Sequence, residues 1–285
     1  GSCYIGSSPD NIEGIFHGYE EMALLSKYGG GIGWDWNEIR ALGGYIDNTK
    51  GAAGGTIPFL KINNDIAIAV DQLGTRKGAI AVYLEPSHLD ILDFIDLKKN
   101  SGEERRRAHD LFPALWIDDA FMEAVLKDSD WNLYDPAEPG VVKQTLKAKD
   151  LWKKILTSYF ESGSPFLCFK DTANRANPNS HVGKIRSSNL CTEIFQNTSP
   201  NQYKIKVWVN EGKEYILFDE EEDVDLLNGS VKKAKKVTSL DKLADCRYTT
   251  NLGNTSDSQL LLADIYCVEK EKINGETAVC NLASV

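Results

Sequence analysis

The octet Ser-Ser-Asn-Leu-Cys-Thr-Glu-Ile occupies residues 187–194. It brings an amide, a thiol and a carboxylate together within five residues, with little apolar padding, which is the composition of a site rather than of a core. If this loop enters a pocket, Cys191 offers sulfur for one-electron or nucleophilic chemistry, Glu193 a base, and Asn189 two donors and an acceptor. A solvated loop that holds a partly buried cysteine is the alternative that the octet alone leaves open.

Two further cysteines lie at opposite ends of the chain, each in a short stretch that predicts a strand. Cys3 lies in Ser-Cys-Tyr-Ile, and Cys280 lies in Thr-Ala-Val-Cys-Asn-Leu-Ala-Ser-Val. The octet and the Cys280 segment together resemble the catalytic (large) subunit of ribonucleotide reductases. The resemblance continues in three upstream motifs: Ala-Ile-Ala-Val-Tyr-Leu-Glu-Pro-Ser-His-Leu-Asp-Ile at 79–91, Asp-Leu-Lys-Lys-Asn at 96–100 and Asp-Leu-Phe-Pro-Ala-Leu-Trp-Ile at 110–117.

For the fold, the resemblance implies part of a ten-stranded α/β barrel made of two parallel five-stranded halves. The chain resembles roughly the first half of that barrel. We therefore expect residues 1–197 to form a barrel half and residues 277–285 to form the barrel strand that carries Cys280. The family usually joins these two parts in far fewer residues, so residues 198–276 are expected to form an inserted β-rich surface subdomain.

For the chemistry, the resemblance implies radical-dependent reduction of ribonucleoside diphosphates to deoxyribonucleoside diphosphates for DNA precursor synthesis. Cys191 would become a transient thiyl radical that takes the 3′ hydrogen of the ribose. Glu193 would deprotonate the 3′ hydroxyl, and Asn189 would hold the hydroxyls in place. Cys3 and Cys280 would form the reducing pair and close to a disulfide, with Cys3 as the proton donor to the departing water.

Other positions that match the family imply contacts to substrate and effector. Besides Asn189 and Glu193, the substrate contacts would come from Ser2, Gly30 and Gly31, although a glycine cluster after a helix is also a plain helix cap.

The allosteric nucleoside triphosphate would be held by Asp10 and Arg40, with Gln72 and Arg76 on a loop that carries information from effector to substrate base. A carboxylate for a ribose hydroxyl and a planar cation for phosphate are the chemically expected choices. Some members of the family have a second arginine where this chain has Asp47.

The resemblance also implies partners. No cofactor would bind directly, because a separate metal-containing small subunit supplies the radical; an adenosylcobalamin-dependent reductase is the alternative, since these motifs occur in both classes. We expect dNTP or ATP as effectors, a homodimer through the effector-site helices, and thioredoxin or glutaredoxin as reductant. A non-catalytic nucleotide-sensing module of the same fold is the alternative from a different class. As part of a barrel, the chain alone is expected to be inactive.

Composition limits the remaining function classes. The chain has 285 residues, is 42% hydrophobic and carries a formal net charge of −10. Its basic runs at 105–107 and 232–236 lie near acidic residues, so no nucleic-acid surface is expected. Its longest aliphatic run, at 66–70, is far shorter than the ~20 residues of a membrane span, and a cytoplasmic protein is expected. The six cysteines contain no C-x-x-C pair and suggest no metal site; a secreted protein with three disulfides remains open.

Hydrophobic periodicity predicts the elements. Helices are expected from residues 8–10 onward, from 56 to about 73, and at 119–127 and 150–161; strands are expected at 79–84, 131–134 and 166–169. This alternation favours a mainly parallel α/β architecture. The glycine-rich stretch 38–55 is expected to be a mobile connection, and the pattern of residues 203–218 predicts a β-hairpin.

Overall fold

The computed structural model describes residues 3–46, 52–70, 77–244 and 264–280. The chain divides into two compact units, residues 1–200 together with 275–285, and residues 201–274.

The first unit is built on a six-stranded sheet with the strand order β17-β1-β2-β5-β6-β9. Its strands are β1 (Cys3–Ser7), β2 (Gly31–Asp35), β5 (Ile80–Leu84), β6 (Leu111–Ile117), β9 (Phe166–Phe169) and β17 (Ala278–Cys280). The five strands from β1 to β9 run parallel, whereas β17 pairs antiparallel with β1. The predicted mixed α/β fold with a mainly parallel sheet is confirmed. Within the described ranges the sheet is open, with β17 and β9 at its edges, and no closed barrel is present.

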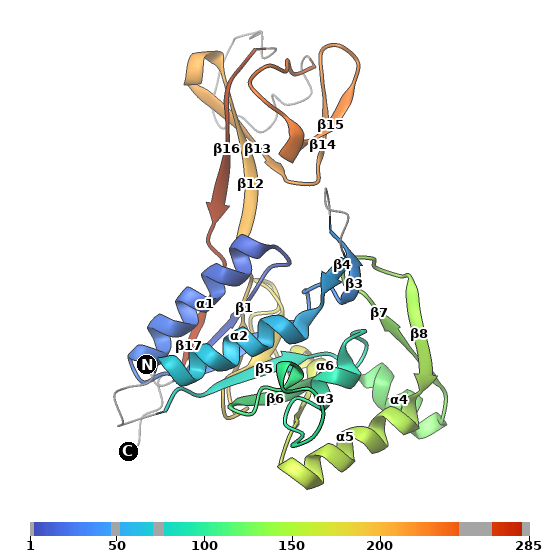
Figure 1. Cartoon of the computed structure of the whole chain (residues 1–285). Helices are drawn as coiled ribbons and strands as arrows, with labels where there is room; N and C mark the ends of the chain where they lie inside the picture. Colours follow the sequence, from blue (N-terminus) through green and yellow to red (C-terminus); the bar gives the residue numbers. More distant parts are fainter. Residues whose placement is uncertain (1–2, 47–51, 71–76, 245–263, 281–285) are drawn as a thin grey trace. The chain divides into compact units, whose positions relative to one another are not determined.

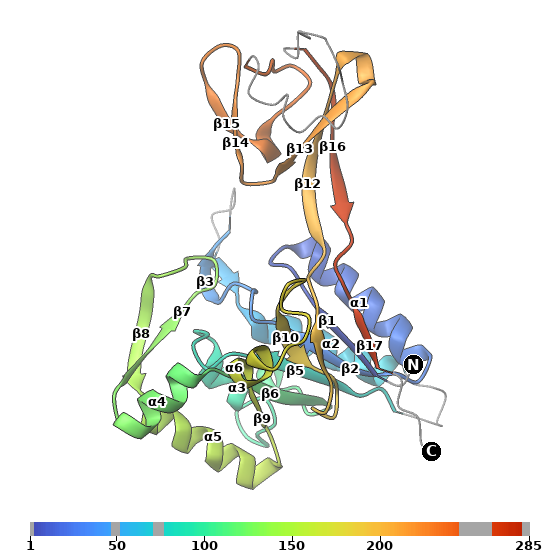
Figure 2. The same cartoon turned by 180° about the vertical axis from the view of Figure 1, so that it is seen from behind.

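The two faces of this sheet bury different partners, because successive side chains of a strand point to opposite faces. Ile80, Val82 and Leu84 of β5 belong to the main core, which also contains buried side chains of α1 (Ile12–Lys27) and α2 (Thr56–Ala69). Figure 1 shows these two helices along one face of the sheet. Ala81 and Tyr83 belong to a smaller core on the opposite face, where Figure 2 shows β10 (Ile185–Ser188) in front of the sheet.

Helix α1 begins slightly later than its sequence suggests, because Asn11 rather than Ser8 caps it. The Asn11 side-chain oxygen accepts a hydrogen bond from the Gly14 N–H at 2.7 Å, which satisfies one of the unpaired donors of the first turn. Tyr19 is buried, but Phe16 is 52% exposed although it follows the same apolar spacing. The helix therefore packs through a narrower stripe than the sequence predicts.

Helix α2 begins at a buried carboxylate from a distant part of the chain. Asp90 accepts hydrogen bonds from the Thr56 N–H at 2.8 Å and the Thr56 hydroxyl at 2.9 Å, and from the Leu42 N–H at 3.0 Å. Leu42 begins β3 (Leu42–Tyr45), which pairs antiparallel with β4 (Ala52–Gly54). Regular structure is therefore present within the stretch predicted as a mobile connection.

The other predicted elements of the first unit agree with the structure. The remaining segments are α3 (Ile91–Ile95), η1 (Glu104–Arg106), α4 (Asp119–Lys127), β7 (Asp130–Tyr134), β8 (Val142–Lys147), α5 (Ala148–Ser162), α6 (Lys170–Arg175) and β11 (Phe195–Asn197). Helix α5 buries Leu151 and Ile155, while Tyr159 is 42% exposed. Cys168 is buried in β9.

The second unit is a small β structure with its own apolar core. Its elements are β12 (Gln202–Val209), η2 (Asn210–Gly212), β13 (Glu214–Asp219), β14 (Asp223–Asp225), β15 (Val231–Lys233), η3 (Ala234–Lys236) and β16 (Ile265–Ile273). The predicted hairpin is confirmed as β12 and β13, which pair antiparallel, and β16 pairs antiparallel with the other side of β12. Among all described residues, no helix is long and apolar enough to cross a membrane.

Candidate active site

The octet lies where β10 ends and turns back into β11. The two strands pair antiparallel, with Ile185 opposite Asn197 and Ser188 opposite Phe195. Between them, Thr192 has a φ of 65°, a conformation that is uncommon for any residue other than glycine and unusual for a β-branched one. Such a conformation persists only where the surroundings hold it. We call residues 189–194 the cysteine loop.

The side chain of Asn189 holds the cysteine loop together. Its amide nitrogen donates to Glu193 Oε1 at 2.7 Å. Its oxygen accepts the N–H groups of Glu193 at 3.1 Å and Ile194 at 3.2 Å. Asn189 is fully buried, and its hydrogen bonds orient the Glu193 carboxylate two residues from Cys191.

Cys191 itself is exposed within this loop. Partial burial, and then the negative charge of Glu193, raise the pKa of its thiol above the ordinary value. It lines a largely apolar pocket of about 450 Å³ together with Phe112, Phe166 and two neighbours in the loop, Leu190 and Thr192. A thiol kept protonated is suited to hydrogen-atom chemistry rather than to attack as a thiolate.

Cys3 and Cys280 are brought together by strand pairing. The antiparallel register of β1 and β17 places Cys3 directly opposite Cys280. Opposed residues in such a pair have Cα atoms about 4.5–5.5 Å apart, within the span of a disulfide, about 4.4–6.8 Å. The backbone thus permits a bond between residues 3 and 280.

The glycines of β2 let the cysteine loop approach this strand pair. A Cβ atom on Gly31 would lie 2.8 Å from Leu190 Cδ2 and 3.3 Å from Cys3 Sγ, so the loop and the Cys3 sulfur meet over this glycine. A Cβ on Gly33 would lie 1.9 Å from the Ser188 carbonyl oxygen. The structure therefore gathers Cys3, Cys280 and the Cys191 loop at one end of the sheet.

The sequence also predicted substrate contacts from Gly30, Gly31 and Ser2. The Gly30 N–H donates to the Leu25 carbonyl at 3.1 Å as part of the α1 cap. A contact from Gly30 to phosphate thus stays a prediction, as does one from Gly31. Ser2 lies outside the described residues.

The predicted effector residues are partly brought together. Arg40 donates through Nε to Asp10 Oδ2 at 2.9 Å and through its backbone N–H to Asp10 Oδ1 at 3.0 Å. Arg40 also donates to the Tyr45 carbonyl at 2.6 Å, which ties this pair to β3. Gln72 and Arg76, and also Asp47, lie outside the described residues.

A buried ionic cluster at the opposite end of the parallel strands was not predicted from the sequence. Asp35 ends β2 and is 2% exposed. Burial raises its pKa to about 7, although the Asn37 N–H and the charge of Arg186 act in the other direction. Arg186, on β10, pairs closely with Glu38. These side chains line a pocket of about 400 Å³. Through Arg186 they contact β10, the strand that leads into the cysteine loop.

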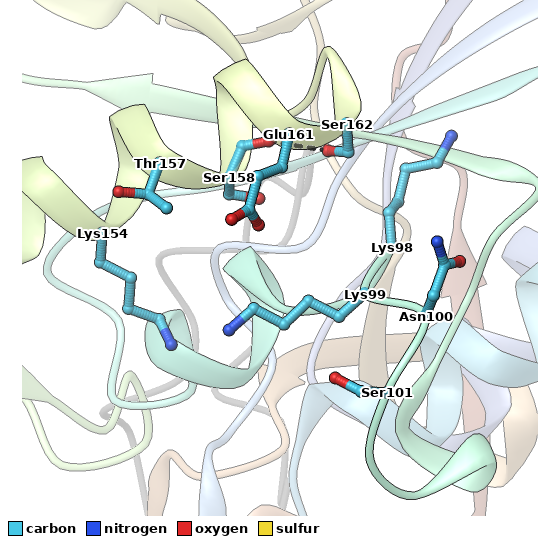
Figure 3. A pocket seen from close by; sticks show the side chains of 9 residues that line it. All are labelled: Lys98, Lys99, Asn100, Ser101, Lys154, Thr157, Ser158, Glu161 and Ser162. Carbon is cyan, nitrogen blue, oxygen red and sulfur yellow. Dashed lines mark hydrogen bonds between the residues drawn. The ribbon is translucent and has the colours of Figure 1, made fainter.

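Another pocket, of about 660 Å³, lies between α5 and the segment after α3 (Figure 3). Lys99 and Lys154 point toward one another there, and both pair with Asp96 at 2.9 Å. Lys98 points away from them. Its ammonium lies 5.0 Å from the centre of the Phe112 ring, and burial lowers its pKa. Across the described residues, no group of three or more His, Cys, Asp or Glu side chains is arranged to hold a metal ion.

Comparison with known proteins connects this geometry to one family. A family model described as "Ribonucleotide reductase, barrel domain" matches residues 1–285. The chain is 56% identical to a Helicobacter pylori (strain J99) protein named "Ribonucleoside-diphosphate reductase subunit alpha", over 100% of this chain and 36% of the relative. It is 44% identical to the "Ribonucleoside-diphosphate reductase large subunit" of Arabidopsis thaliana, over 70% of this chain and 28% of the relative. The chain thus spans about a third of the length of these relatives.

Proposed function

Since the chain belongs to the ribonucleotide reductase barrel-domain family, we propose that it forms part of the catalytic subunit of a ribonucleoside-diphosphate reductase. The observation that carries this proposal is the meeting of three distant segments. Cys3 and Cys280 are opposite one another across paired strands, and the loop that carries Cys191 packs beside Cys3 over Gly31. A radical thiol and a separate pair of reducing thiols are the chemical requirements of ribose reduction.

In the proposed reaction, the Cys191 thiyl removes the hydrogen atom from C3′ of the ribose, and its sulfur becomes a thiol. Glu193, held by Asn189 at 2.7 Å, accepts the proton of the 3′ hydroxyl. The C2′–O bond breaks, and the hydroxyl leaves as water with a proton from Cys3. Cys280 gives a hydrogen atom to C2′, and its sulfur bonds to the Cys3 thiolate as a disulfide radical anion. This anion passes its extra electron to the C3′ carbonyl and becomes the Cys3–Cys280 disulfide, while Glu193 returns its proton to the 3′ oxygen and leaves a radical at C3′. The Cys191 thiol finally returns a hydrogen atom to C3′, which restores the thiyl.

The radical comes from outside these residues in this proposal. A metal-containing small subunit supplies the one-electron oxidant for Cys191, and thioredoxin or glutaredoxin reduces the Cys3–Cys280 disulfide after each turnover. Activity that requires the small subunit supports this assignment; activity with adenosylcobalamin in its place refutes it.

We also propose how the barrel is completed, how subunits associate and where an effector binds. Residues 1–197 and 277–285 belong to a ten-stranded barrel, residues 198–276 are an insertion in it, and the enzyme works in the cytoplasm as a homodimer that contacts through its effector-site helices. Asp10 binds the ribose and Arg40 the phosphates of a nucleoside triphosphate. For this, the hydrogen bonds between Arg40 and Asp10 must break, or the two side chains must bind the nucleotide while they stay in contact. Calorimetry with dATP tests this site: Arg40→Ala should weaken binding, and unchanged affinity would exclude Arg40.

The experiment that tests the function uses the complete subunit, assayed for CDP reduction with its small subunit and a dithiol reductant. Cys191→Ser should abolish turnover while CDP binding is retained, because serine keeps the size of the side chain but does not form a comparable radical. Substantial reduction by the serine variant would contradict the assignment. Cys267→Ser is the matched control, because Cys267 is a free thiol on β16 of the second unit.

A further inference from the structure

A buried tyrosine on β5, Tyr83, donates a hydrogen bond directly to the cysteine loop. The Tyr83 hydroxyl donates to the Asn189 carbonyl oxygen at 2.7 Å, and the two residues are 106 positions apart in sequence. Tyr83 is fully buried on β5. Because burial raises the pKa of its hydroxyl far above the usual range, the group stays protonated and acts as a donor.

The bond from Tyr83 reaches the one residue of the loop that organises the others. The backbone carbonyl of Asn189 receives the Tyr83 hydrogen bond, while the Asn189 side chain bonds the Glu193 carboxylate and the N–H groups of Glu193 and Ile194. A displacement of Asn189 would therefore move the Glu193 carboxylate.

The surroundings of Tyr83 leave its ring little freedom. Its ring centre is 6.1 Å from that of Trp116 in an edge-to-face arrangement, and Trp116 stacks on Phe195 of β11 at 6.1 Å. Leu190 of the cysteine loop packs against the same small core. Tyr83, Trp116 and Phe195 thus support both arms of the loop, and the Tyr83 hydroxyl adds a directional contact to the Asn189 backbone.

We propose that Tyr83 is a positioning residue for ribonucleotide reduction: its hydroxyl fixes Asn189, and Asn189 in turn orients Glu193 beside Cys191. The inference rests on the proposed function, because it assigns Glu193 a proton-accepting role. Tyr83 does not touch the substrate in this account, and its effect is transmitted through two hydrogen bonds.

The test is Tyr83→Phe in the complete subunit. The substitution keeps the ring and its contacts with Trp116 but leaves the buried Asn189 carbonyl without its donor. We expect kcat for CDP reduction to fall about tenfold or more, while KM for CDP changes less than about twofold. We also expect amide hydrogen exchange to become faster in peptides that cover residues 189–194, because the Glu193 and Ile194 N–H groups are bonded to Asn189.

Tyr19→Phe is the matched control. The Tyr19 hydroxyl donates to the Phe59 carbonyl at 2.7 Å, and Tyr19 is also buried, at 4% exposure, but it lies on α1 and away from the cysteine loop. It should lower stability by a similar amount and leave both kcat and exchange of residues 189–194 unchanged. A kcat for Tyr83→Phe within twofold of wild type, or an equal loss of kcat in both variants, would overturn the proposal. If the wild-type subunit reduces no ribonucleotide, the proposed function fails. Separately, unchanged amide exchange at residues 189–194 in Tyr83→Phe would refute the claim that the Tyr83 hydroxyl holds the cysteine loop.

Discussion

Replacement of Gly33 by alanine tests the closest approach between the sheet and the cysteine loop. The added Cβ would lie 1.9 Å from the Ser188 carbonyl oxygen and 2.8 Å from both Cα and the carbonyl carbon of Asn189. All three atoms belong to the backbone, so no side chain can rotate away. An ordinary contact of about 3.4 Å requires β2 and the loop to separate by roughly 1.5 Å.

This displacement should affect activity more than stability. Overpacking of this kind costs about 1–3 kcal/mol, less than the roughly 5–15 kcal/mol by which a typical native protein is stable. A shift of about 1 Å in a reacting group can cost about 100-fold in rate, and Gly33 faces the residue that orients Glu193. We therefore expect Gly33→Ala to lower kcat of the complete subunit about 100-fold, with a decrease of about 2 kcal/mol in the free energy of unfolding.

The assays are steady-state CDP reduction and urea unfolding. Gly183→Ala is the control, because a Cβ there would have its nearest neighbour, in the Asn197 side chain, at 3.8 Å, and it should leave both quantities nearly unchanged. If Gly33→Ala keeps more than half of the wild-type kcat, the loop does not depend on contact with the Gly33 backbone and the reasoning is refuted.

Two further predictions concern stability and modularity. The pKa of buried Asp35 is raised to about 7, so between about pH 4 and pH 7 the folded state holds a proton that the unfolded state has lost. The free energy of unfolding therefore falls as pH rises through this window. Asp35→Asn should flatten that fall in urea titrations, and a pH profile identical to that of the wild type would contradict the raised pKa. Ser199 and Glu276 are joined by two backbone hydrogen bonds, at 2.9 and 3.2 Å. Replacing residues 201–274 with a short glycine-serine linker should therefore leave the first unit folded, as judged by circular dichroism and cooperative unfolding. Loss of the cooperative transition would show that the second unit is required for folding.

Short-range patterns predicted many of the regular elements. The apolar run before Glu85 gives β5, and the spacing of Leu151 and Ile155 gives the buried stripe of α5. These patterns work because side-chain periodicity depends only on local geometry. Phe16 shows their limit, because equal spacing on α1 does not reveal how much of the helix the sheet covers.

Contacts between distant residues account for what was missed. Asp135 and Asp90 accept the N–H groups of Ala41 and Leu42 and fix the backbone that leads into β3. No local sequence pattern indicates such distant partners. The hydrogen bond from Tyr83 to Asn189 spans 106 residues, so the tyrosine appears in the sequence only as one member of an apolar strand. Gly33 carried a weak signal, as a glycine within a strand often marks a close backbone approach.

The most direct test of the account is to identify which cysteines are oxidised when ribose is reduced. The complete subunit should be pre-reduced, freed of dithiol, allowed to turn over once with CDP and its small subunit, then alkylated and mapped by mass spectrometry. We predict one disulfide per deoxynucleotide formed, joining Cys3 to Cys280, with Cys191 recovered as a thiol. Deoxynucleotide formation with Cys3 and Cys280 both alkylated, or with a disulfide that includes Cys191, would contradict the central claim.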